Sequence, residues 1–152
     1  MHQNLKDNYF VGIQFLLFGL FFLKLDLGYN LPEVIKYPGL LMFLMGGILT
    51  LVSMIQLNRN LTAFPTPKEK AFLYTGGVYG FARHPIYTGV ILIFLGLTFY
   101  SLSVYKFLIT CWLVILFYFK SGYEEEQLKK KYLEYEEYKN ITGRFFPKFK
   151  FK

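Results

Sequence analysis

Long runs without a charged residue dominate this chain and limit what it can fold into. The cleanest run, Pro38 to Leu57, has twenty residues and no Asp, Glu, Lys or Arg. As an α-helix it would be about 30 Å long, which matches the hydrocarbon core of a bilayer. The chain has 152 residues, of which 54% are hydrophobic, too many for one soluble domain of this size to bury. The sequence therefore predicts an integral membrane protein.

The other apolar runs extend this prediction to four spanning helices. Tyr9 to Leu23 is apolar except for Gln14 and is lengthened by nearby leucines. The run from Ile86 to Phe119 carries one charge, Lys106, and as a single helix it would be about 51 Å long. That exceeds the bilayer thickness, so we expect a turn near Ser101 to Lys106 that makes this run a helical hairpin. The predicted spans are therefore about residues 9–27, 38–57, 86–102 and 105–122.

The chain past the last span is polar but keeps a helical pattern. Glu124, Leu128, Tyr132 and Tyr135 fall on one stripe of a helix, which predicts an amphipathic helix that continues out of the membrane. The tail from Ile141 to Lys152 alternates aromatic and basic residues, so we expect it at the membrane interface. The predicted fold class is an all-α integral membrane protein. One domain, residues 1–152, would hold four transmembrane helices and a C-terminal cytoplasmic amphipathic helix.

The basic residues predict the orientation of these spans. With four spans, the N-terminus, the loop from Asn58 to Pro85 and the C-terminal region share one side and hold 14 of the 17 Lys and Arg residues. Positive loops face the cytoplasm, so we expect a multi-pass protein with both termini and any site near them cytoplasmic. The net charge of +7 then fits an anionic membrane face rather than nucleic acid. Cys111 alone makes neither a disulfide nor a zinc site, and no metal is predicted.

Two polar clusters bracket the predicted hairpin. Arg83, His84 and Tyr87 precede it, and Glu124 and Glu125 follow it. A helical hairpin returns to the side where it began, so the clusters can meet at the membrane surface, where charged groups are costly and often functional. Three other interpretations stay open: interfacial anchors, solvated glutamates, and a buried Arg–Glu pair that only ties the hairpin to its neighbour.

The segments that contain these residues resemble the sequence motifs of a known family. Residues 77–89, Gly-Val-Tyr-Gly-Phe-Ala-Arg-His-Pro-Ile-Tyr-Thr-Gly, resemble the Gly-Pro-Tyr-x-x-x-Arg-His-Pro-x-Tyr-x-Gly segment of the isoprenylcysteine carboxyl methyltransferase family and the related phospholipid methyltransferases. The second half of the family signature follows across the hairpin, as Glu124-Glu125-x-x-Leu128, Tyr135-x-x-Tyr138 and Arg144-x-x-Pro147. The resemblance covers about half the chain and implies a minimal, prokaryotic type of member.

This resemblance implies S-adenosylmethionine as the cofactor. It implies that residues 76–89 and 120–147 form cytoplasmic-side cofactor-binding elements. Gly89 would leave room for the ligand against its helix, and Arg83 or Arg144 would orient the acceptor. The residues expected to bind the cofactor are Tyr79, His84, Pro85, Tyr87, Gly89, Glu124 and Glu125.

The acceptor stays open at this stage. A carboxylate acceptor is ionised at neutral pH and needs an arginine rather than a base, whereas an amine acceptor needs His84 or a glutamate to remove its proton. The resemblance favours carboxyl O-methylation of an isoprenylcysteine-like, lipophilic or prenylated substrate drawn from the membrane lipid. The alternatives are a phospholipid or amine N-methyltransferase, an NADPH-dependent sterol-type reductase, and a non-enzymatic four-helix membrane interaction protein.

Overall fold

The computed structural model describes residues 5–25 and 32–148, and this part of the chain is helical. An isolated β-bridge joins Ala82 and Gly143. Short 3₁₀ turns occupy residues 33–35, 58–60 and 77–80. The predicted all-α class is confirmed. The α-helices are α1 (Leu5–Phe21), α2 (Lys36–Leu57), α3 (Pro85–Ser101), α4 (Val104–Lys131) and α5 (Tyr135–Ile141).

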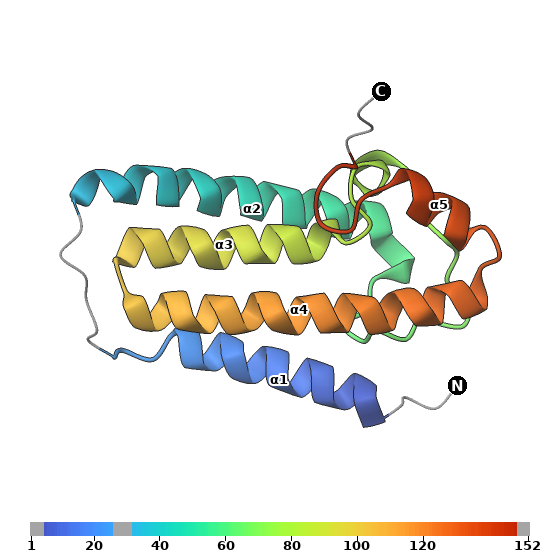
Figure 1. Cartoon of the computed structure of the whole chain (residues 1–152), viewed down its shortest axis with the longest axis horizontal. Coiled ribbons are helices and arrows are strands. Elements are labelled where there is room, and N and C mark those ends of the chain that lie inside the picture. Colours follow the sequence, from blue (N-terminus) through green and yellow to red (C-terminus); the bar gives the residue numbers. More distant parts are fainter. Residues whose placement is uncertain (1–4, 26–31, 149–152) are drawn as a thin grey trace.

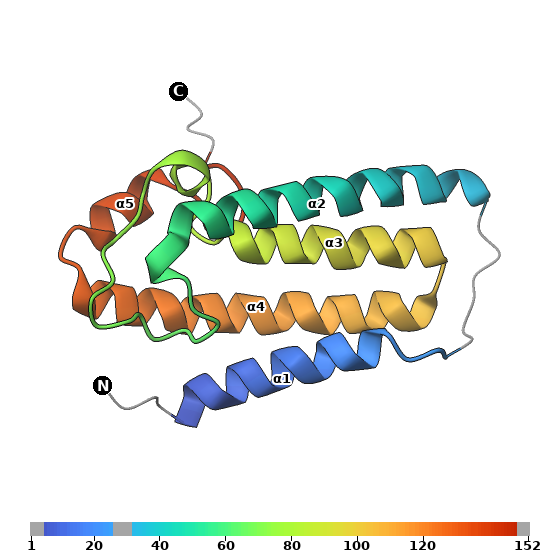
Figure 2. The same cartoon turned by 180° about the vertical axis from the view of Figure 1, so that it is seen from behind.

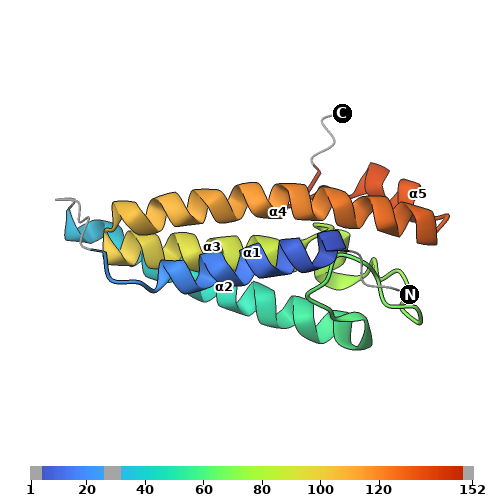
Figure 3. The same cartoon turned by 90° about the horizontal axis from the view of Figure 1, so that it is seen from below.

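The four longer helices lie side by side in the order α2, α3, α4, α1 (Figure 1, and from behind in Figure 2). Seen from below, α4 and α2 lie on opposite sides of the molecule (Figure 3). The start of α1, the end of α2, the start of α3 and the end of α4 share one end with α5 (Figure 1). We call this the polar end, because the connection 58–84 and residues 132–148 lie there.

The turn between α3 and α4 confirms the predicted hairpin. α3 ends at Ser101, and Leu102 adopts a left-handed conformation with φ of 48°. Ser103 then caps α4, since its side chain accepts a hydrogen bond from the backbone N–H of Lys106. α4 runs on to Lys131 and so continues well past the last predicted span, as expected.

Two predicted boundaries near the N-terminal half are wrong. The first span was placed at residues 9–27, but α1 begins at Leu5 and ends at Phe21, and residues 26–27 lie outside the described part. The second span was predicted to begin at Pro38, but α2 begins two residues earlier, at Lys36. Pro38 lies in the first turn of α2, where a backbone N–H would have no helical partner.

The prediction of one continuous amphipathic helix after the last span is also wrong. α4 ends at Lys131, and Tyr132 is extended, with φ of −123° and ψ of 119°. The break turns the chain so that α5 folds back over the polar end (Figure 1). Tyr138 of α5 can then donate its hydroxyl hydrogen to the backbone oxygen of Tyr79, at 2.6 Å.

Glycines allow α2 and α3 to pack closely. A Cβ on Gly46 would lie 2.6 Å from the carbonyl oxygen of Gly89, and a Cβ on Gly96 would lie 2.6 Å from that of Gly39. Such small residues let two helix backbones approach each other. The neighbouring Gly47 takes no part in this contact, because a Cβ on it would meet nothing within 4 Å.

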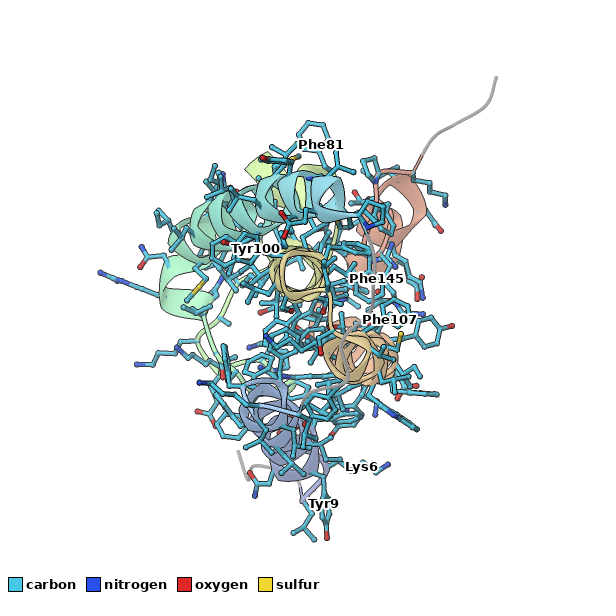
Figure 4. All side chains as sticks on the ribbon, turned by 90° about the vertical axis from the view of Figure 1, so that its left-hand side faces the viewer. Lys6, Tyr9, Phe81, Tyr100, Phe107 and Phe145 are labelled. Atoms are coloured by element: carbon cyan, nitrogen blue, oxygen red, sulfur yellow. The ribbon has the colours of Figure 1, made fainter. Side chains whose placement is uncertain are left out.

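The outward faces of the helices are apolar. A core of Phe21, Phe94, Leu113 and Phe117 joins α1, α3 and α4, but only 11% of the most apolar stretch of α2 is buried. A core helix of a soluble protein would be mostly buried. Tyr9 and Phe81 point outward at opposite edges of the end-on view (Figure 4). The exposed apolar side chains include Leu44, Ile48, Leu51, Ile55, Trp112, Ile115 and Phe119.

By length and composition, two helices in the described residues could cross a membrane: residues 33–60, which include α2, and α4. α3 is apolar but has 17 residues, and α1 also has 17. A straight span needs about 20 residues. The helices therefore support a membrane protein.

Candidate functional site

The two polar clusters meet at the polar end, as the hairpin predicted. The hydroxyl of Tyr87 donates to Glu124 Oε2 at 2.7 Å. His84 Nε2 lies 3.3 Å from Glu125 Oε1, and its Nδ1 lies 3.7 Å from Glu124 Oε2. The rings of His84 and Tyr87 are stacked with centroids 5.4 Å apart. The start of α3 and the last turns of α4 therefore form one site.

Glu125 is the centre of a buried ion cluster. The residue is 2% exposed, and its Oε1 accepts hydrogen bonds from Arg83 Nη2 at 2.8 Å and from Arg144 Nε at 3.2 Å. Lys139 Nζ lies 3.5 Å from the other carboxylate oxygen. Arg83 also donates to the backbone oxygens of Lys139 and Thr142. Most N–H groups of Arg83 are therefore used to tie the start of α3 and the end of α4 to residues 139–148, which we call the C-terminal segment.

The C-terminal segment packs against the site, a role that its prediction as an interfacial tail did not include. The backbone N–H of Arg83 donates to the oxygen of Gly143 at 2.9 Å, and that of His84 donates to the oxygen of Arg144 at 3.0 Å. The hydroxyl of Thr88 donates to the backbone oxygen of Phe145 at 2.9 Å. Backbone donors in a buried turn need partners, and residues 143–145 supply them. Residues 149–152 of the predicted tail lie outside the described part.

A cavity of about 440 Å³ opens beside the paired clusters, between the polar ends of the four long helices and the connection 58–84. This volume falls within the range of small-molecule sites. Phe18, Met54 and Val90 line its apolar part. The predicted site residues that line it are Tyr79, Arg83, His84, Pro85, Tyr87 and Glu124.

Three predicted site residues do not line the cavity. Glu125 lies in the ion cluster just described. Arg144 binds Glu125 and lies over the ring of Tyr118, 5.0 Å from its centroid, and Tyr118 is 56% exposed. Gly89 faces α2, where a Cβ would collide with Thr50 Oγ1. The expectation that Gly89 makes room for a ligand is wrong, because its missing side chain serves the packing of α2 against α3.

Lys120 is a cavity residue that the sequence analysis missed. It is 1% exposed, and its Nζ donates to Gln14 Oε1 at 2.5 Å and to the backbone oxygen of Ala63 at 2.9 Å. The ammonium also lies 5.4 Å from the centroid of the Tyr87 ring. Both Lys120 and Gln14 line the cavity. Two features of the sequence could have identified this pair. Gln14 is the one strongly polar side chain in the first apolar run, and Lys120 directly follows the last apolar run.

Tyrosines form a second polar part of the wall. The hydroxyl of Tyr79 donates to the backbone oxygen of Ser53 at 3.3 Å. Burial raises the pKa of Tyr79 and of Tyr138, so both hydroxyls stay protonated donors. Tyr135 lines the cavity, yet its hydroxyl is buried and has no hydrogen-bond partner among the described residues. An unpartnered buried hydroxyl is costly, and a bound ligand would satisfy it.

The long connection between α2 and α3 closes the cavity on one side. Asn60 fixes it by bonding the backbone N–H and oxygen of Phe72, and Tyr132 donates to the oxygen of Ala71 at 2.6 Å. Although α4 ends at Lys131, the predicted stripe of Glu124, Leu128, Tyr132 and Tyr135 still faces one cavity. Besides Asn60 and the site residues already named, the residues of the connection that line it are Leu61, Thr62, Ala63, Phe64, Pro65, Pro67, Ala71, Phe72, Leu73 and Tyr74.

Comparison with known families identifies a related family. The family model described as phospholipid methyltransferase matches residues 34–135, about two thirds of the chain. The matched range contains α2, the cavity connection, the 77–89 motif and the paired glutamates, and it ends at Tyr135. No curated protein matches the chain.

Proposed function

Because the chain belongs to the phospholipid methyltransferase family, we propose that it is a membrane enzyme that methylates a lipophilic acceptor with S-adenosylmethionine. The observation that carries the proposal is the meeting of His84, Tyr87 and Glu124 at one cavity. A carboxylate, an imidazole and tyrosine rings stand there beside an apolar wall. Such a site suits a polar cofactor and a lipid acceptor together.

The cavity residues fit the cofactor. S-adenosylmethionine, when bound, supplies a methyl group activated by a positively charged sulfonium. Glu124 is held in place by the hydroxyl of Tyr87 and offers a fixed carboxylate to positive charge, to which the rings of Tyr87 and Tyr79 add their faces. The unpartnered hydroxyl of Tyr135 offers a further hydrogen bond. The cavity volume of about 440 Å³ is suited to a ligand of this size.

The geometry favours an amine acceptor over a carboxylate. Arg83 is occupied by Glu125 and backbone oxygens, and Arg144 does not line the cavity, so neither is placed to orient an acceptor carboxylate. His84 and Glu124 do line it. Either would take the proton from an acceptor ammonium and leave the nitrogen lone pair free to accept the methyl group. We therefore propose the amine of a phospholipid head group as acceptor, with an isoprenylcysteine-like carboxylate as the alternative.

We propose four spans with the polar end in the cytoplasm. α1 and α3 lie alongside α2 and α4 (Figure 1), so we propose that all four cross the same bilayer. Of the 15 Lys and Arg residues in the described ranges, this arrangement puts 12 on the side of the polar end. The acceptor would reach the cavity from the cytoplasmic leaflet.

The test uses the detergent-purified protein. Isothermal titration with S-adenosylhomocysteine should give saturable binding, and NADPH should not. Radiolabelled S-adenosylmethionine should then label phosphatidylethanolamine in mixed micelles, and His84→Ala should abolish the labelling. Stabilisation by NADPH alone would favour the reductase and refute the proposal. Label in farnesylcysteine that base releases as methanol would identify a carboxyl ester and refute the amine acceptor.

A further inference from the structure

We propose that Lys120 and Gln14 form a subsite for an anionic group, a carboxylate or a phosphate, of the ligand in the cavity. The inference rests on the proposed function and adds binding residues that the sequence motifs do not contain. Lys120 lies on α4, and Gln14 comes from α1, more than a hundred residues earlier. Both line the same cavity as Glu124 and His84.

Lys120 forms no direct ion pair with a carboxylate of the described residues. Its two hydrogen-bond acceptors, the side-chain amide of Gln14 and the carbonyl of Ala63, are neutral. Among the described residues no carboxylate lies within ion-pair distance of Lys120, whereas Arg83 and Arg144 both bind Glu125. Glu124 and Asp7 attract the ammonium only from a longer range, so this buried cation has no counter-ion in direct contact. An anionic group on the ligand would supply one.

Asp7 is the other buried carboxylate near this part of α1. It lies two turns before Gln14, it is fully buried, and neither of its oxygens has a hydrogen-bond partner in the described residues. It forms no ion pair with Lys120 and does not line the cavity. Lys120 lines the cavity, and two of its three N–H groups are used by Gln14 and Ala63, so the third is available to a ligand.

The position of Lys120 also matches a ligand with both charges. Lys120 and Glu124 are four residues apart on α4 and share one face, with side chains that start about 6 Å apart. Glu124 can hold a positive group while Lys120 holds a negative one. The amino-acid part of S-adenosylmethionine carries an ammonium and a carboxylate. The head group of phosphatidylethanolamine carries an ammonium and a phosphate. The cofactor and the acceptor are thus two possible sources of the same chemistry.

The experiment compares ligands that differ in one group. S-adenosylhomocysteine and S-adenosyl-3-thiopropylamine share the nucleoside, the thioether and the amine, but the second lacks the carboxylate. If the subsite takes the cofactor carboxylate, Lys120→Met should bind S-adenosylhomocysteine roughly 10- to 100-fold more weakly and bind the decarboxylated analogue as the wild type does. If it takes the lipid phosphate, affinity for both nucleosides should stay unchanged, and KM for a short-chain phosphatidylethanolamine should rise by a similar factor.

Controls separate a binding effect from misfolding. Lys130→Met makes the same change on the exposed side of α4 and should alter none of these values. A variant that binds the decarboxylated analogue as tightly as the wild type does is folded. Lys120→Gln serves as a second neutral variant, and it keeps a hydrogen-bond donor for the backbone oxygen of Ala63. If the Lys120 variants change neither S-adenosylhomocysteine affinity nor acceptor KM by more than twofold, the inference is overturned and the proposed function stands. A wild type that binds no S-adenosylhomocysteine overturns both.

Discussion

Glu124 and Glu125 are neighbours in the chain, but the structure gives them different tasks. Glu124 lines the cavity and receives a hydrogen bond from Tyr87, whereas Glu125 is buried in the ion cluster with Arg83 and Arg144. We therefore predict that the same substitution, Glu→Gln, separates ligand binding from stability when it is made at the two positions in turn.

The contacts set the size of each effect. Glu125→Gln removes the counter-charge of Arg83, whose side chain is 8% exposed, and breaking a buried pair in this way costs about 3–5 kcal/mol. For a chain of this length that corresponds to a fall in Tm on the order of 10 °C. At Glu124, the amide oxygen of a glutamine can still accept the Tyr87 hydrogen bond, so the loss of stability should stay below about 1 kcal/mol. The lost charge should weaken binding of a cationic ligand roughly 10- to 100-fold.

Two measurements on detergent-purified protein check this prediction. Thermal unfolding gives the change in Tm for each variant, and isothermal titration with S-adenosylmethionine, which carries the sulfonium, gives the change in affinity. Because Glu125 holds the C-terminal segment, Glu125→Gln should also speed up proteolysis after Lys139. The reasoning fails if Glu124→Gln lowers Tm as much as Glu125→Gln does. It also fails if Glu125→Gln leaves Tm unchanged while it weakens binding.

Three further predictions concern packing and ionisation. Gly46→Val should cost about 1–3 kcal/mol because it pushes α2 away from α3, and Gly47→Val, in open space, should not; equal Tm values would contradict this contact. Tyr138→Phe should cost about 1 kcal/mol in thermal unfolding through loss of the hydrogen bond to the backbone oxygen of Tyr79, and an unchanged Tm would argue against that bond. Burial raises the pKa of Tyr138, whereas an unfolded tyrosine ionises near pH 10, so its stabilising contribution is complete below about pH 10 and is lost as the pH rises further. Tm should therefore fall above about pH 10, and less steeply in Tyr138→Phe; identical slopes would show that this hydroxyl is not involved.

The local pattern of the chain was enough to predict the helices and the meeting of the two polar clusters. The length of the apolar runs against the bilayer thickness required a turn near Ser101, and the structure has it at Leu102. A hairpin returns to its own side whatever its packing, so Tyr87 and Glu124 had to come close. The 77–89 motif and the paired glutamates also pointed to the family.

Tertiary structure alone decided which residues face the cavity. Successive helical residues differ by about 100° around the axis, so small rotations of α4 determine that Glu124 faces the cavity and Glu125 faces the C-terminal segment. Gly89 belongs to a helix contact because α2 lies against that face of α3. The pairing of Lys120 with Gln14 depends on where α1 packs, and no local pattern in the sequence carries that information.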